Sequence, residues 1–285
     1  MKHFKYLFLV LCTIFVFEMI SFNKAEAACG LDADGVVSEN DIDNGCDTKP
    51  DIYEVVIYKL YLCTSAPTEA TTSSTVVLTP CSQIFNNANG ATASVTQGSD
   101  INLNGAYTRP PNGTYTHGYA YMDNTFGITW SGEIEASMTG MTGGTGVFCA
   151  SVAGSGTHKK GSTHNNSSVC SSTDNLTAGK FVETMEHFGD PSNNFLSKGE
   201  QSNINGSTAS IVGLLVDTNE HRAVNSGEVV KLEGLVSFAN PVVVTTATTS
   251  LSMSFNVGEG MHLNDGGSNK LQVGSGPFQA IMTAN

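Results

Sequence analysis

The sequence predicts an all-β protein, an antiparallel β-sandwich with a long disulfide-stapled insertion. Many short runs are rich in β-branched and aromatic residues, and turn-forming residues separate these runs. No stretch has a convincing helical periodicity, so strands do not alternate with helices as they would around a parallel sheet. These observations together favour antiparallel sheets that pack face to face.

The first strand is expected at residues 53–63, YEVVIYKLYLC, which contain neither Gly nor Pro. Asn-Gly pairs that begin at Asn89, Asn104, Asn112 and Asn205 supply turns, since both residue types tolerate a positive φ. The further strands expected in this part of the chain are residues 75–79, 82–85, 100–103, 118–122 and 126–138.

The last third of the chain repeats this pattern. In SLSMSFNV, residues 250–257, apolar residues alternate strictly with polar ones, which indicates a strand with one buried and one solvated face. The best helical candidate is KFVETMEHF, residues 180–188, and it fits a strand almost as well. The strands expected here are residues 210–216, 229–238, 241–246, 251–257, 270–273 and 278–283.

Composition divides the chain into five segments. A signal peptide is expected at residues 1–27 and an acidic amino-terminal segment at residues 28–51. The β-sandwich is expected in two parts, residues 52–139 and residues 210–285. Residues 140–209 between them are rich in Gly, Ser, Thr and Asn, which bury little surface, so we expect a long insertion there.

The amino-terminal residues have the features of an export signal. Two lysines precede an apolar or neutral run at residues 6–17, which is too short to span a membrane as a helix. Ala25 and Ala27 suit cleavage before Ala28. The alternative, an uncleaved anchor, would have to bury Glu18.

The cysteines predict three disulfides. The chain has seven cysteines, and Cys12 leaves with the signal, so an even number remains in an exported chain. Six cysteines can pair in many ways, but their order favours bonds between neighbours, and none has zinc-site spacing. The expected pairs are Cys29 with Cys46, Cys63 with Cys81, and Cys149 with Cys170.

Two phrases of the sequence carry a family resemblance. PNGTYTHGYAYMDNTFGITWSGEI, residues 111–134, and TTSLSMSFNV, residues 248–257, resemble secreted bacterial prealbumin-like or immunoglobulin-like β-sandwich domains of unknown function. Such domains place a GTYT turn before a central strand and an alternating strand near the end. The resemblance covers residues 53–138 and 229–283, and it implies a sandwich fold and a surface location without any catalytic motif.

The acidic stretch CGLDADGVVSENDIDNGC, residues 29–46, is the candidate metal site. An EF-hand-type loop needs spaced oxygen ligands and a Gly at its sharp turn. With Gly35 at that turn, Asp32, Asp34 and Asp41 occupy ligand positions, although Gly30 occupies the first one. This weak calcium site has two alternatives, a solvated acidic loop or a looser cluster formed by Asp41, Asp43, Asn44 and Asp47.

Charge and motifs disfavour nucleic-acid binding and catalysis. The formal net charge is -13, whereas phosphate contacts need clustered Lys or Arg. The chain contains no GxSxG or HExxH motif and no phosphate-binding Gly loop. Glu133 and Glu135 share a strand face, and His158 and His164 flank two lysines, but an exposed strand and an exposed loop explain these residues better. We therefore do not expect an enzyme.

Aromatic residues between positions 115 and 130 could stack on sugar rings. Tyr119 and Tyr121 share one strand face and Trp130 follows closely, so these three are candidates for a glycan platform. The alternative is that they fill the interior of the sandwich.

Export, disulfides and a surface rich in Ser, Thr and Asn predict a secreted structural or adhesive surface protein, such as an extracellular filament or matrix subunit. The alternative is an extracellular glycan- or calcium-binding module. Expected partners are copies of the chain itself or surface glycans, with no nucleic acid and no membrane after signal cleavage. No cofactor is expected apart from weakly bound calcium. The expected location is extracellular, at the cell surface or periplasmic.

Overall fold

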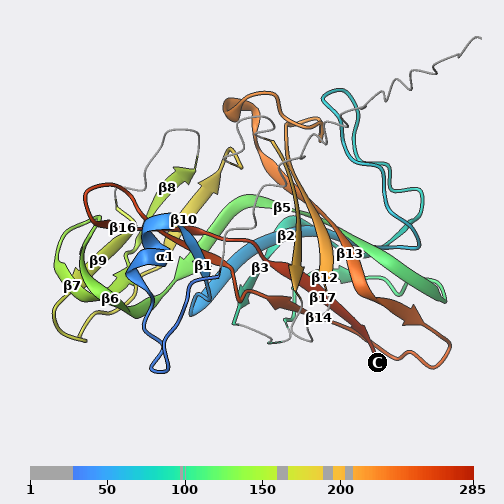
Figure 1. Ribbon diagram of the computed structural model, residues 1–285. Coiled ribbons are helices and arrows are strands. Elements are labelled where there is room, and N and C mark those ends of the chain that lie inside the picture. Colours follow the sequence, from blue (N-terminus) through green and yellow to red (C-terminus); the bar gives the residue numbers. More distant parts are fainter. Residues whose placement is uncertain (1–27, 97–98, 100, 159–165, 189–194, 203–207) are drawn as a thin grey trace, which may run out of the picture.

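The computed structural model describes residues 28–96, 99, 101–158, 166–188, 195–202 and 208–285. The expected signal peptide lies outside these residues, so its cleavage stays a prediction. The all-β fold is confirmed: two large sheets and one small sheet form a sandwich-like body, with one short α-helix (Figure 1). None of the helices in the described part of the chain is long and apolar enough to cross a membrane.

The larger sheet is built around β5, which pairs with β2, β10 and β13. Its main path runs in the order β11-β12-β13-β5-β2-β3-β4, while β10 pairs with β5 and β8 pairs with β10. Its strands are β2 (Ile52–Cys63), β3 (Cys81–Val95), β4 (Ala106–Tyr107), β5 (Gly113–Thr129), β8 (Gly154–His158), β10 (Phe181–Met185), β11 (Leu196–Ser202), β12 (Thr208–Val216) and β13 (Lys231–Val244).

The second sheet has the order β1-β15-β16-β6-β7-β9, and β14 and β17 form a separate two-stranded sheet. In Figure 1 the second sheet lies at the left and the main path of the larger sheet extends to the right. The strands are β1 (Cys46–Thr48), β6 (Ser131–Gly140), β7 (Thr145–Ser151), β9 (Ser168–Ser171), β14 (Leu251–Asn256), β15 (Met261–Asp265), β16 (Lys270–Ser275) and β17 (Gln279–Ala284), and the helices are α1 (Glu39–Asn44) and the 3-10 turn η1 (Ser226–Glu228).

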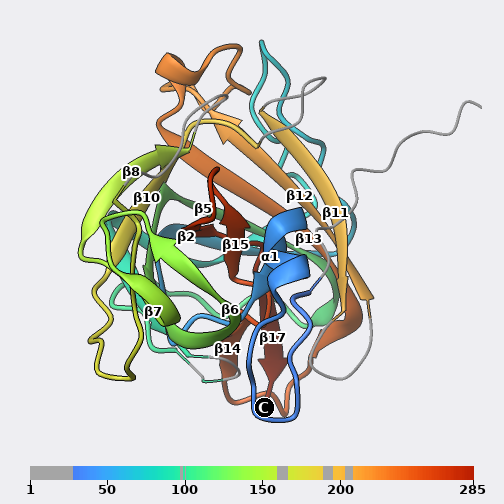
Figure 2. The same cartoon turned by 60° about the vertical axis from the view of Figure 1, so that its left-hand side comes forward.

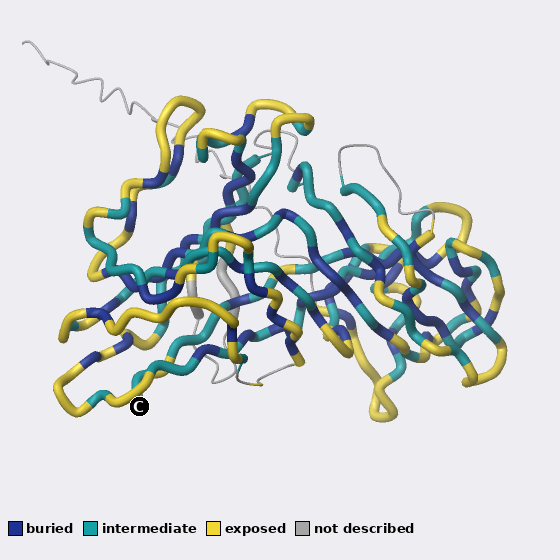
Figure 3. Tube along the Cα trace, turned by 180° about the vertical axis from the view of Figure 1, so that it is seen from behind, coloured by how far each residue is buried: buried dark blue, intermediate teal, exposed yellow. Residues whose placement is uncertain are grey.

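Alternation along the strands builds the core between these sheets. In β2, Tyr53, Val55 and Ile57 are buried, and a register shift after Ile57 lets Leu60 and Leu62 continue the same buried row. Buried positions concentrate where strands cross, whereas hairpin ends are exposed (Figure 3). A smaller buried cluster lies apart from this core and includes Tyr119, Leu214 and Leu235.

Several expected elements differ from the structure. The helical candidate at residues 180–188 contains strand β10, because Phe181 and Glu183 alternate inward. Residues 75–79 make only the single bridge of Val77 to Thr68, and residues 101–103 form no strand. Residues 229–238 and 241–246, expected as two strands, join in β13 with a register shift between Ser237 and Val242.

The three expected disulfides are confirmed, with S–S distances of 2.05 to 2.09 Å. Cys149 and Cys170 are directly opposite residues of the neighbouring strands β7 and β9. Residues 140–209 therefore carry their own disulfide, and they also supply strands to both large sheets. Cys63 and Cys81 are likewise opposite one another, on β2 and β3, while Cys29 ties the amino-terminal segment to β1.

Candidate ligand-binding pocket

A pocket of about 800 Å³ lies on one face of the larger sheet. Its other walls come from β10, β14, β15, β16 and β17. In Figure 2, β15 lies in front of β2 and β5, between β10 on one side and β12 and β13 on the other. The volume falls within the range of pockets that hold small molecules in other proteins.

The floor of the pocket consists of residues with little or no side chain. Gly213 of β12, Gly234 of β13 and Ala120 of β5 are directly opposite one another in register and all line the pocket. A Cβ added to Gly213 would lie 3.0 Å from Phe188 Cζ, and one added to Gly234 would lie 3.1 Å from Met122 Cε. The bare backbone therefore gives space that side chains would otherwise occupy.

Most of the remaining wall is apolar and rich in Met and Phe. Methionine side chains are flexible and adapt to irregular shapes, so such a wall can fit around a ligand. The apolar residues that line the pocket from outside the larger sheet's main path are Met185, Phe188, Met253, Phe255, Phe278, Ala280 and Met282.

The polar end of the pocket comes from β15 and β16. Met261 and Leu263 of β15 are fully buried, whereas His262 and Asn264 alternate with them and line the pocket. On β16, Gly274 is directly opposite His262. Polar residues of these two strands, among them His262 and Asn264, thus line one end of a pocket that is otherwise mainly apolar.

The carboxylate of Glu183 occupies the space above Gly274. A Cβ on Gly274 would lie 3.2 Å from Glu183 Oε1. Directly opposite residues of an antiparallel pair have Cβ positions about 5 Å apart. Glu183 and His262 therefore belong to one polar group, although β10 and β15 are far apart in the sequence.

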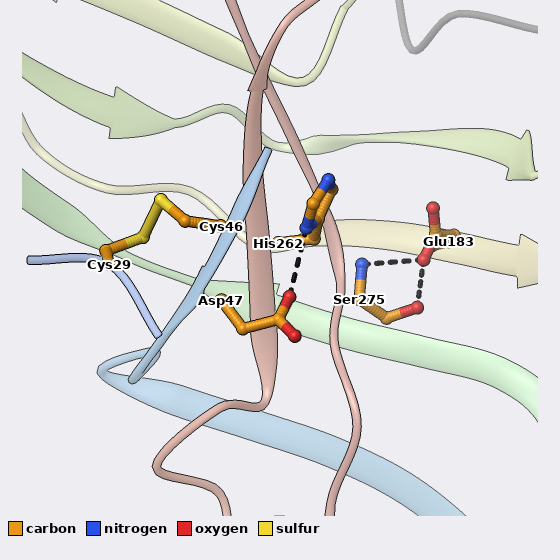
Figure 4. A network of polar contacts seen from close by, with 6 residues as sticks. All are labelled: Cys29, Cys46, Asp47, Glu183, His262 and Ser275. Atoms are coloured by element: carbon orange, nitrogen blue, oxygen red, sulfur yellow. Dashed lines mark hydrogen bonds and ion pairs between the residues drawn. A yellow bond between two sulfur atoms is a disulfide. The ribbon is translucent and has the colours of Figure 1, made fainter. Parts of the chain in front are cut away.

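Two carboxylate–imidazole pairs define this polar end, and Figure 4 shows one of them, Asp47 with His262, beside Glu183 and Ser275. Glu183 is 1% exposed, and its Oε2 accepts a hydrogen bond from the Ser275 backbone N–H at 2.7 Å and another from the Ser275 hydroxyl. His158 Nδ1 lies 3.9 Å from Glu183 Oε1. The second pair is His262 Nδ1 with Asp47 Oδ1 at 3.0 Å. Asp47 follows Cys46, so the first disulfide anchors the strand that carries this carboxylate.

Two further buried polar atoms belong to residues that line the pocket. Tyr53 Oη and Gln279 Oε1 have no hydrogen-bond partner within the described ranges. Burial and the charge of Glu183 raise the pKa of the Tyr53 hydroxyl well above its usual value, so this group stays protonated. Buried polar atoms are normally satisfied, so these two are available to a ligand or to water.

The calcium site at Asp32, Asp34 and Asp41 stays a prediction, and the structure shows local backbone hydrogen bonds to two of these acids. Asp32 Oδ1 accepts the backbone N–H groups of Asp34 and Val36, and Asp41 Oδ2 accepts that of Gly30 at 2.6 Å. Nowhere in the part of the chain that the structure describes do three His, Cys, Asp or Glu residues form a group that could hold a metal. These acids stabilise turns of the amino-terminal segment.

The glycan platform of Tyr119, Tyr121 and Trp130 stays a prediction, and two of its three residues are buried. Tyr119 and Trp130 are both 4% exposed. Tyr121 is half-buried, with Tyr58 against its edge and the Lys59 ammonium 4.8 Å from its ring centre. The alternative, that these aromatic residues fill the interior, holds for Tyr119 and Trp130.

The other candidate acids and histidines of the sequence lie in different parts of the structure. Glu133 and Glu135 are exposed on β6, as expected for a solvated strand face. His158 joins the polar end of the pocket, which sequence reasoning missed, and His164 lies outside the described residues. The glutamate in FVETM, residues 181–185, is the one signal that could have drawn attention to the pocket, since it takes an inward position of an alternating strand.

A second buried carboxylate, Glu233, lies in the larger sheet and is fully buried. The Tyr119 hydroxyl donates a hydrogen bond to Glu233 Oε1 at 2.9 Å, and Oε2 has no partner among the described residues. Burial raises the pKa of Glu233 to about 7, while Tyr119 opposes this shift.

Comparisons with protein-family models, curated proteins and solved structures find no match to this chain. The fold and the pocket therefore define only a class: a disulfide-bonded all-β protein with a mainly apolar pocket that has one polar end.

Proposed function

We propose that this protein is an exported, non-catalytic binding protein that holds one small, mainly apolar molecule in the pocket. The observation that carries the proposal is the pocket of about 800 Å³ with its Gly floor and its Met- and Phe-rich walls. Small-molecule sites have this combination of a concave apolar surface with a few convergent polar groups.

Packing energetics support a functional pocket. Protein interiors are close-packed, and empty space in a core lowers stability because the lining atoms lose contacts. A larger residue at Gly213 or Gly234 would reduce the space. Gly213 and Gly234 give room to the side chains of Phe188 and Met122, and an occupant of the pocket would lie against these side chains.

The location is part of the proposal. Three disulfides are typical of an oxidising compartment, either extracellular or periplasmic. The expected signal peptide at residues 1–27 would deliver the chain there. Mass spectrometry of the exported protein tests this part: a mature chain beginning at Ala28 supports it, and an uncleaved chain in the cytosol contradicts it.

Fluorescence titration with the neutral apolar probe N-phenyl-1-naphthylamine tests binding. We expect saturable binding at one site. Ala120→Phe places a ring on the pocket floor and should weaken binding at least tenfold, whereas Thr114→Phe, on an exposed position of the same strand, should leave it unchanged.

A second variant that fills the pocket keeps the test valid if Ala120→Phe does not fold. Gly199 of β11 lines the pocket, and a Cβ there meets no atom within 4 Å. Gly199→Leu should therefore fold normally and still weaken binding of the probe. Thermal unfolding verifies that each variant is folded. No saturable binding, or equal binding by both folded filling variants, would contradict the proposal.

A structural or adhesive role, as a filament or matrix subunit, is the second candidate. The observation in its favour is that β11 ends the strand order of the larger sheet and pairs there only with β12, among the described strands. An open edge can pair with a strand of another subunit. Electron microscopy of the concentrated protein tests this role: filaments support it, and strictly monomeric particles contradict it.

A further inference from the structure

We propose that the polar end of the pocket selects a ligand with a primary amine on an apolar body and disfavours a ligand with a carboxylate. This inference rests on the proposed binding function. Its basis is the placement of Glu183, His158, Asp47 and His262, together with the buried oxygens of Tyr53 and Gln279, which have no hydrogen-bond partner among the described residues.

The charge of the polar end disfavours an anion. It contains two carboxylates, Glu183 and Asp47, each beside one imidazole. Even if both imidazoles were protonated, the two pairs together would carry no net positive charge. An anionic head group buried here would lack a compensating charge, and such burial is strongly unfavourable.

No other cation among the described residues of the pocket corrects this balance. Of the described residues that line the pocket, only Lys198 is permanently cationic. Its ammonium donates to Glu69 Oε1 at 2.6 Å, and its side chain is 56% exposed. Lys198 is therefore engaged at the surface instead of neutralising an anion at the polar end.

The buried hydrogen-bonding groups that line the pocket suit a ligand that donates hydrogen bonds. An ammonium group has three N–H donors and no acceptor. Gln279 Oε1 is buried without a partner among the described residues, and Tyr53 Oη can accept through its lone pairs. Glu183 adds a buried negative charge that attracts the ammonium, and hydrogen bonds to charged groups are stronger than those between neutral ones.

The apolar body would occupy the remaining pocket. Met253, Phe255 and Met282 line it on the β14–β17 side, opposite the floor of small residues. An aliphatic chain or ring gains free energy on leaving water for such a surface. The ligand class is therefore an alkyl or aryl amine, with a neutral alcohol binding more weakly and a carboxylic acid weakest.

Displacement of N-phenyl-1-naphthylamine by octylamine, octanol and octanoate at neutral pH tests the inference. These probes share one chain length and differ in the head group. We expect octylamine to displace the probe at least tenfold more tightly than octanoate, with octanol between them.

Two variants locate the selectivity. Glu183→Gln should reduce the preference for octylamine over octanoate to threefold or less, with octanol nearly unchanged. Asp47→Asn can keep a hydrogen bond to His262 and should reduce the preference for octylamine partly. This variant replaces Glu183→Gln in the test if Glu183→Gln does not fold. The matched control Glu133→Gln changes an exposed acid of β6 and should keep the full preference.

The outcomes separate the two proposals. If no compound displaces the probe and the probe itself does not bind, the proposed function fails. If the probe binds but octanoate binds as tightly as octylamine, or if both folded variants at the polar end keep the full preference, the amine selectivity is overturned while the binding function stands.

Discussion

The two faces of the larger sheet use the same strands for different purposes. On β5, Ala120 and Met122 line the pocket, whereas Tyr119, which also borders the pocket, packs into the second buried cluster. The face that carries this cluster is covered by residues 64–80, in which Ala70 and Val76 are buried. Small residues thus make space on one face, and large ones close the other, because successive residues of a strand point to opposite sides.

Glu183 and Glu233 are two buried acids of the pocket lining, and their surroundings differ. Glu183 lies at the pocket among residues of β8 and β16. Glu233 also lines the pocket, but its Oε1 accepts a hydrogen bond from the Tyr119 hydroxyl, whose ring belongs to the second buried cluster. The difference leads us to expect that Glu183 governs ligand selectivity, whereas Glu233 governs stability and its dependence on pH.

Removal of the Cys63–Cys81 disulfide should give the largest change in stability. The bond joins residues 18 apart and closes the segment that covers the non-pocket face. The double variant Cys63→Ser/Cys81→Ser should lower the free energy of unfolding by about 3 kcal/mol, measured by urea denaturation. Affinity for the apolar probe should stay within twofold at a temperature where the variant is folded. Lost affinity in the folded variant would mean that the two faces are not independent.

The pH dependence of stability should come next in size. The pKa of Glu233 is raised from 4.5 to about 7 in the folded protein, so the protonated form is favoured by folding. Its contribution is fully present below pH 4.5 and is lost as the pH rises through about 7. Between about pH 4.5 and pH 8, wild type should lose about 2 to 3 kcal/mol relative to Glu233→Gln.

Denaturant unfolding across this pH range, compared between wild type and Glu233→Gln, measures the effect. The exposed Glu135→Gln serves as the matched control and should follow wild type. Parallel pH curves for wild type and Glu233→Gln would show that Glu233 is charged in the folded protein and would remove the proposed contrast between the two carboxylates.

Loss of the Tyr119 hydroxyl should have a smaller effect. Tyr119→Phe removes the hydrogen bond to Glu233 and should lower the free energy of unfolding by about 1 to 2 kcal/mol near neutral pH. Because Tyr119 lowers the pKa of Glu233, its loss should also move the pH transition upward. Tyr61→Phe is the control, since Tyr61 packs edge-on against Tyr119 and belongs to the same cluster. A pH transition that moves equally in both variants would refute the role of this hydrogen bond.

The fold could be predicted from the sequence to a large extent, because strand periodicity and cysteine order are local or sequential signals. Residues 53–63 and 250–257 show the alternation that the structure contains. The prediction was wrong where pairing between distant strands decides the local structure. Residues 180–188 fit a helical pattern, but residues 181–185 form β10, which pairs with β5 and β8.

The pocket could not be predicted, because it depends on register between distant strands. Gly213, Gly234 and Ala120 become neighbours only through the pairing of β12, β13 and β5. His262 and Asp47 are 215 residues apart in the chain. The acids at residues 32–41 are close in sequence, which predicts a metal site, but the carboxylates of Asp32 and Asp41 accept hydrogen bonds from the local backbone.

The smallest expected effect tests whether the bare floor matters for binding. Gly213→Ala places a methyl group 3.0 Å from Phe188 Cζ, and the ring can move only into the pocket space or away from the floor. The methyl group should displace the probe from apolar contact equivalent to about one carbon. Such contact is worth about 0.8 kcal/mol, so probe affinity should fall about fourfold. Gly199→Ala is the matched control, because its methyl group meets nothing within 4 Å, and it should bind the probe as wild type does. Equal affinity of both alanine variants would mean that the probe does not reach the floor between β12 and β13, and the pocket's occupant would then lie against β14 and β17.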